Sequence, residues 1–167
     1  MTSLPFRPLG LAAALLAALA LGACSRDQTA LGLGADGGRA AAGAPGSPQD
    51  FVASVGDRVF FESDSSDLTS ASIATLDRQA AWLQRYPRNA VLLEGHADER
   101  GTREYNFSLG ARRAQAVRDY LATRGVRAER VRTVSYGKER PVAVCNDISC
   151  WSQNRRAVTV IEAGAGS

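Results

Sequence analysis

Residues 94–117 read EGHADERGTREYNFSLGARRAQAV, and the elements on either side of them are arranged around this stretch. The apolar run Val91–Leu93 just before it predicts a strand, and the polar residues that follow predict a tight loop. Thr102 has the side chain of a helix N-cap, so a long helix should begin there. We expect this helix to run to about Arg124, because Gly125 can adopt the left-handed conformation that ends many helices.

One face of the expected helix is mostly apolar, yet Arg113 projects from it. Residues at spacings of three and four make up this face, namely Asn106, Leu109, Gly110, Ala114, Val117 and Leu121. A guanidinium held against a core needs a carboxylate partner, since an unpaired buried charge is very costly. The nearest candidate is Asp98, at the end of the preceding strand.

Two interpretations of the pair formed by Asp98 and Arg113 are open on spacing alone. The first is a structural salt bridge that closes the corner between strand and helix. The second is a recognition site for a zwitterion, in which Asp98 binds an ammonium group and the planar fork of Arg113 binds a carboxylate. Gly101 and Gly110 would let a ligand or another backbone segment approach closely.

The same stretch resembles the peptidoglycan-binding signature of OmpA-like domains, in the version found in the family of peptidoglycan-associated lipoproteins (Pal). The general pattern is D-x-x-G-x-x-x-x-N-x-x-L-(S/G)-x-x-R-A-x-x-V. This chain supplies it without a gap, as Asp98, Gly101, Asn106, Leu109, Gly110, Arg113, Ala114 and Val117. The resemblance implies that Asp98 and Arg113 hold diaminopimelate, a residue of the peptide stem that ends in a free amino-acid group. It therefore favours the recognition site over the salt bridge.

Further candidates for the same ligand site come from the motif and from a polar loop earlier in the chain. They are Gly101, Asn106, Leu109 and Gly110 in the motif, and Ser63, Asp64 and Ser65 in the loop.

The N-terminus predicts an exported lipoprotein. Residues 1–23 read as a signal peptide whose apolar segment Leu9–Leu21 is too short to span a bilayer comfortably. It ends in a run, LGAC, that resembles the bacterial lipobox and implies triacylation of Cys24; an ordinary signal with a chance Cys is the alternative. Ser25 after the Cys is consistent with sorting to the outer membrane. Residues 24–50 therefore read as an acylated Cys followed by a flexible linker rich in Ala and Gly.

Residues 51–167 read as one α+β domain. The expected elements are, in order, a strand at 58–61, a helix from Thr69 or Ser70 to just before Pro87, a strand near Val91, the motif helix, and strands at 131–136 and 157–161. With a short helix before the last strand, this order suggests a mixed four-stranded sheet with helices packed on one face. The resemblance covers about residues 55–162 and implies the OmpA-like architecture.

Cys145 and Cys150 are expected to form a disulfide, because an exported protein folds in an oxidising compartment. Two free thiols or half of a metal site are the alternatives, and the metal site is weak because His96 is the single histidine. The pair is distant from the motif in sequence, so its loss should affect stability and not ligand binding; the alternative is that the short segment before Asn154 lies beside the site. We expect no metal and no cofactor.

Charge and motif content exclude other function classes. The net charge of +3 is small and interspersed, which argues against a nucleic-acid partner. No G-x-S-x-G, phosphate-binding loop or dinucleotide fingerprint occurs, and His96 with its acidic neighbours lacks the HExxH spacing of a zinc enzyme. We therefore predict a protein that is not an enzyme.

Two non-catalytic functions are open, a cell-wall anchor and a module whose main partner is another protein. The resemblance implies both: binding to peptidoglycan and binding to TolB and other proteins of the Tol–Pal system. It also implies a location at the cell outer membrane, with a lipid anchor and the domain facing the periplasm. In that system the protein would support envelope integrity and cell division.

Overall fold

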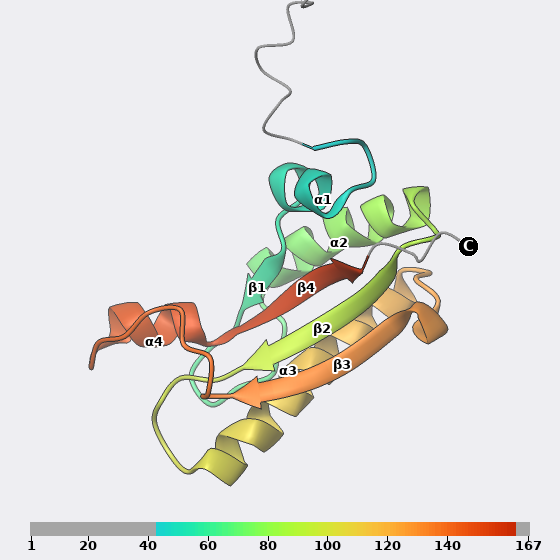
Figure 1. Cartoon of the computed structure of the whole chain (residues 1–167). Coiled ribbons are helices and arrows are strands. Elements are labelled where there is room, and N and C mark those ends of the chain that lie inside the picture. Colours follow the sequence, from blue (N-terminus) through green and yellow to red (C-terminus); the bar gives the residue numbers. More distant parts are fainter. Residues whose placement is uncertain (1–42, 163–167) are drawn as a thin grey trace, which may run out of the picture. The chain divides into compact units, whose positions relative to one another are not determined.

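The structure is a computed structural model that describes residues 43–162 (Figure 1). The predicted signal peptide, Cys24 and most of the predicted linker lie outside the described residues. The elements are, in order, α1 (Pro48–Ser54), β1 (Arg58–Phe60), α2 (Ser70–Arg85), β2 (Ala90–His96), α3 (Arg103–Thr123), a 3₁₀ turn (Ala128–Arg130), β3 (Val131–Gly137), α4 (Ile148–Asn154) and β4 (Arg156–Glu162). This order confirms the predicted α+β class.

The four strands form one mixed sheet in the order β1-β4-β2-β3. β2 and β3 run parallel because α3 connects them as a crossover, whereas β4 runs antiparallel to both β1 and β2. The last strand therefore inserts between the first and second. As a result, the C-terminal ends of β2 and β3 lie at the same edge of the sheet as the start of β4 (Figure 1).

Helices α2 and α3 lie on one face of the sheet, as expected (Figure 1). Both begin as the sequence indicates, since the Thr69 side chain accepts from Ser72 N and that of Thr102 accepts from Tyr105 N. The core between helices and sheet includes Leu76, Leu83, Leu93, Val117 and Leu121, each fully buried. In the described part of the chain no helix is long and apolar enough to cross a membrane.

The backbones of α3 and β2 approach each other closely at two glycines. A Cβ on Gly95 would lie 1.8 Å from the Gly110 carbonyl oxygen, and one on Gly110 would lie 2.4 Å from Ser135 Oγ. Any larger side chain would push α3 away from the sheet. Gly110, a predicted supporting residue of the ligand site, therefore packs helix against strand instead of lining the cleft described below.

The domain begins with a helix, α1, that the sequence pattern did not predict. Residues 48–50, assigned to the linker, form the first turn of α1, which is capped by Ser47. Trp82 Nε1 donates to the Asp50 carboxylate at 3.0 Å, and Phe51 is fully buried against the Trp82 ring. These long-range contacts explain the difference, because a seven-residue helix has little stability without tertiary packing.

Candidate functional site

Arg113 is fully buried on α3, and backbone carbonyls surround its guanidinium. Its Nε donates to Ser65 O at 2.9 Å, Nη1 to His96 O at 2.7 Å and Nη2 to Glu62 O at 3.1 Å. The side chain thereby ties the loop after β1 to the end of β2. Burial and the charge of Arg155 lower the pKa of Arg113 to about 10, so it stays cationic at neutral pH.

The structural salt bridge between Arg113 and Asp98, one of the two interpretations that spacing left open, does not form. Three carbonyl oxygens satisfy the guanidinium, which removes the need for a carboxylate that the sequence argument had assumed. Carbonyl dipoles stabilise a buried cation when several converge on it, because each lone pair faces a donor of the fork. The attraction between Arg113 and Asp98 acts only at longer range.

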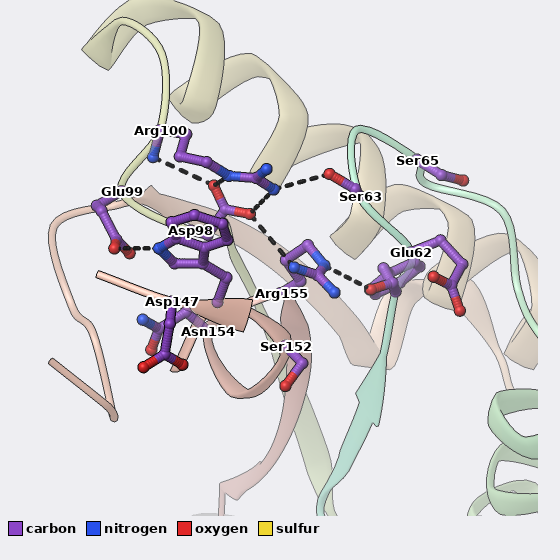
Figure 2. Close-up of polar contacts among 12 residues, drawn as sticks. Glu62, Ser63, Ser65, Asp98, Glu99, Arg100, Asp147, Ser152, Asn154 and Arg155 are labelled. Carbon is purple, nitrogen blue, oxygen red and sulfur yellow. Dashed lines mark hydrogen bonds and ion pairs between the residues drawn. The ribbon is translucent and has the colours of Figure 1, made fainter. Parts of the chain in front are cut away.

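Asp98 instead pairs with two other arginines (Figure 2). Arg100 approaches it through its backbone N and Nε, each 3.2 Å from Oδ1, and through Nη2, 2.6 Å from Oδ2. Arg155 adds Nη1 at 3.5 Å from Oδ2. Burial alone would raise the pKa of the Asp98 carboxyl. The hydrogen bonds from Arg100 lower it by more, so the pKa lies below the usual value. Asp98 is therefore a carboxylate at neutral pH.

Arg100 and Arg155 were missed as site residues by the sequence reading. Arg155 is buried and also donates to Phe61 O at 3.0 Å, so it joins the start of β4 to the end of β1. The pattern NRRAVTV carries a weak signal: two arginines at the start of an apolar strand must point to opposite faces, so at least one meets the protein. No comparable signal marks Arg100.

A cleft of about 260 Å³ lies over Asp98 and the first turns of α3. Its lining residues are Ser63, Asp64, Asp98, Arg100, Gly101, Tyr105, Asn106 and Leu109. The structure therefore brings together six of the predicted site residues around one hollow. Arg113, Ser65 and Gly110 are not among the lining residues. Arg113 supports the cleft indirectly, because it donates to the carbonyls of Glu62 and Ser65 and so holds the loop of residues 62–65.

That loop is held at each of its residues. Arg113 binds the carbonyls of Glu62 and Ser65, and Arg100 Nη2 donates to Ser63 Oγ at 2.7 Å. The Tyr105 hydroxyl donates to the Asp64 carboxylate, which raises the pKa of Tyr105. Asp64 has φ of +57°, a left-handed conformation that no other non-glycine residue adopts within residues 43–162. An unfavourable backbone held by several contacts is a frequent property of binding sites.

The disulfide between Cys145 and Cys150 is present, with a Cα–Cα distance of 5.7 Å. It joins the loop after β3 to α4, and α4 lies beside the cleft despite its distance in sequence. Trp151 follows the second cysteine, donates from Nε1 to the Glu99 carboxylate, and places its ring 4.3 Å from the guanidinium carbon of Arg100. The structure therefore supports the alternative in which the short segment before Asn154 lies beside the site.

His96 is the single histidine of the chain and was weighed in the sequence only as a weak metal-ligand candidate. It is buried at the end of β2, and burial together with the charges of Arg156 and Arg140 lowers its pKa to about 4, so it is neutral at pH 7. Between residues 43 and 162 no group of three or more His, Cys, Asp or Glu side chains is placed to hold a metal ion.

Comparison with known proteins agrees with this geometry. The OmpA family model matches residues 60–155, more than half of the chain. The chain is 60% identical over 160 residues to the peptidoglycan-associated lipoprotein of Rhizobium meliloti (strain 1021), a match that covers 92% of this chain and 88% of that protein. It is 47% identical over 154 residues to the lipoprotein of the same name from Pseudomonas aeruginosa, covering 87% and 91% of the two chains.

Solved structures show the same architecture. The crystal structure of the peptidoglycan-associated lipoprotein from Burkholderia pseudomallei is similar with a TM-score of 0.62 and 42% identity, covering 64% of this chain and 90% of that one. The C-terminal domain of Helicobacter pylori MotB has a TM-score of 0.61 at 24% identity, covering 65% and 86% of the chains, and shows the fold alone. The chain therefore belongs to the OmpA family and, within it, to the peptidoglycan-associated lipoproteins.

Proposed function

We propose that this protein binds peptidoglycan non-covalently by holding the free amino-acid group of diaminopimelate in the cleft over Asp98. The observation that carries the proposal is a carboxylate, only 7% exposed and ionised, at the base of a cleft with guanidinium groups behind it. A zwitterion suits this arrangement because its ammonium group meets Asp98 and its carboxylate meets positive charge. It also adds no net charge to a partly buried site.

Arg113 supplies the carboxylate contact in this proposal. Three of its five N–H groups donate to carbonyls. Because Arg113 is fully buried and lies outside the cleft lining, the loop of residues 62–65 would have to shift for a ligand carboxylate to reach the other two. Arg113 then has a double function, since the group that positions the loop also binds the ligand.

The site works by binding and not by catalysis, in keeping with a family of non-enzymatic lipoproteins. Acylation of Cys24 would anchor the chain in the outer membrane, and the segment up to Gly43 would carry the domain across to the cell wall. A triacylated Cys makes a lasting anchor, because each buried CH₂ adds about 0.8 kcal/mol. The protein thereby tethers the outer membrane to the wall and supports envelope integrity and division as part of the Tol–Pal system.

A protein partner is the second function, and an apolar surface next to the cleft favours it. Val142, Val144 and Ile148 are 53%, 88% and 62% exposed; the two valines come just before the Cys145–Cys150 bridge and Ile148 lies within it, shortly before Trp151. Exposed apolar side chains gathered on one rigid segment are typical of protein–protein contacts. We propose TolB as the partner, and a protein seated on this segment would restrict access of the wall to the cleft.

The test uses the mature protein in detergent and purified cell-wall sacculi. Wild type should sediment with sacculi, whereas Asp98→Asn should not, because the amide keeps the shape but loses the charge that balances the ligand ammonium. Arg103→Gln is the matched control: it removes one exposed charge from the first turn of α3 and should bind as wild type does. A folded Asp98→Asn protein that sediments normally would contradict the proposal.

The second function has its own measurement. Soluble TolB added to the same assay should reduce sedimentation of wild type, and Val144→Asp should relieve that reduction without changing wall binding. If TolB has no effect on wild type, the overlap between the two functions is wrong while wall binding stands.

A further inference from the structure

The cleft side of Asp98 is occupied by Arg100. Both carboxylate oxygens receive a donor from this one side chain, Nε at 3.2 Å and Nη2 at 2.6 Å, and the backbone N of Arg100 adds a third contact at 3.2 Å. Two parallel N–H···O contacts to one carboxylate are the strongest ion-pair geometry available to arginine. An ammonium group from a ligand would need the same oxygens.

The two arginines at Asp98 differ in how they are held. Arg155 lies on the protein side, where it is buried and bound to Phe61 O, so it cannot leave without disrupting the junction of β1 and β4. Arg100 lies on the cleft side with 43% of its side chain exposed (Figure 2). The other contacts of its side chain are the Ser63 hydroxyl, which lines the cleft, and the Trp151 ring on α4. Arg100 is thus the partner that can be exchanged.

We propose that Arg100 is an internal substitute for the ligand's ammonium group, and that it swings off Asp98 when diaminopimelate binds. This inference rests on the proposed function. In the free protein Arg100 keeps Asp98 ionised and paired, so the carboxylate is never left buried without a cation. On binding, one cation replaces another, and the charge at Asp98 stays balanced throughout.

The structure also provides a place for the displaced guanidinium. Trp151 lies beneath it, and the Glu99 carboxylate, bound to Trp151 Nε1, already attracts Arg100 electrostatically. A small rotation of the side chain can therefore keep the stacking contact while the charge moves from Asp98 toward Glu99.

This exchange makes Arg100 a specificity-determining residue. A ligand can open the site only if it supplies its own cation to Asp98, because removal of Arg100 alone would leave a nearly buried carboxylate short of a partner. Peptide stems that carry a neutral group in place of the ammonium cannot displace Arg100 from Asp98, so they are rejected without any steric clash.

The experiment is a calorimetric titration of the mature protein in detergent with a soluble muropeptide that contains diaminopimelate. Arg100→Gln removes the competing charge and should bind about two- to fivefold tighter than wild type, the range expected for a half-exposed ion pair that no longer has to be broken. Arg100→Lys keeps a cation without the fork and should fall between the two. Arg103→Gln, which removes a charge three residues away, should leave the affinity unchanged.

A second ligand separates competition from a general change of the site. Acetylation of the free amino group of diaminopimelate removes the ligand cation, so wild type should bind this form weakly. Arg100→Gln should then bring no gain, because the acetylated ligand has nothing to place against Asp98. An equal gain for both ligands would show that Arg100 affects the site by another route and would overturn the inference.

The movement itself has a spectroscopic signature. The emission of Trp151 should change when the unmodified muropeptide binds wild type, since the guanidinium stacked on its ring shifts from Asp98 toward Glu99, and this change should be much smaller in Arg100→Gln. Weaker binding by Arg100→Gln would mean that Arg100 contacts the ligand directly, and would refute the inference. If wild type does not bind the muropeptide at all, the proposed function fails instead.

Discussion

Replacement of Arg113 with methionine should destabilise the protein severely, while replacement of the adjacent Arg112 should not. Methionine keeps most of the volume of Arg113 but leaves three carbonyl oxygens without their donor, those of Glu62, Ser65 and His96. The His96 carbonyl is buried, so it loses its partner without access to water; the other two lie in partly buried positions that water can reach.

The size of the effect follows from these contacts. A buried acceptor left unsatisfied costs about 1–3 kcal/mol, so three fully buried carbonyls would together cost about 3–9 kcal/mol. We expect a loss of about 3–5 kcal/mol in the free energy of unfolding, reduced from a larger sum because water can reach the carbonyls of Glu62 and Ser65. For a domain of this size the midpoint temperature should fall by about 10–20 °C.

Urea unfolding followed by circular dichroism measures the loss, with Arg112→Met as control. Arg112 is exposed on the same helix, so its replacement should change stability by less than about 0.5 kcal/mol. Arg113→Lys should be intermediate in stability, because a single ammonium cannot reach all three carbonyls. If Arg113→Met unfolds at the same urea concentration as wild type, the carbonyl network does not stabilise the fold.

Three further outcomes are expected. The pKa of Asp98 is depressed in the folded state, so its contribution to stability is complete at neutral pH and is lost as the pH falls below about 4; the stability difference between wild type and Asp98→Asn should shrink over that range in urea titrations. The double variant Cys145→Ser, Cys150→Ser should lose about 2 kcal/mol, and it should also bind sacculi more weakly because α4 carries Trp151 beside the cleft; unchanged sedimentation would show that α4 keeps its place without the bridge. Cys24→Ala should move the protein to the soluble periplasmic fraction once the wall is digested, and persistence in the outer-membrane fraction would refute the lipid anchor.

The sequence alone determined the elements whose causes are local. The helix α3 begins after Thr102 and ends before Gly125 because a side-chain cap and a left-handed glycine act within a few residues. The spacing of apolar positions placed Arg113 on the buried face for the same reason. The motif also located the cleft, since most of its lining residues belong to one continuous segment.

Only the tertiary structure decided which groups meet across the chain. The insertion of β4 between β1 and β2 places Arg155 against Asp98, and the sequence separation of 57 residues leaves no periodic trace of that contact. The partners of Arg113 are backbone carbonyls, which every residue carries, so the residue types in the sequence could not predict them. A buried cation must be paired or hydrogen-bonded, and the local sequence pattern predicts that Arg113 is such a cation. Which oxygen atoms accept its hydrogen bonds depends on the tertiary fold.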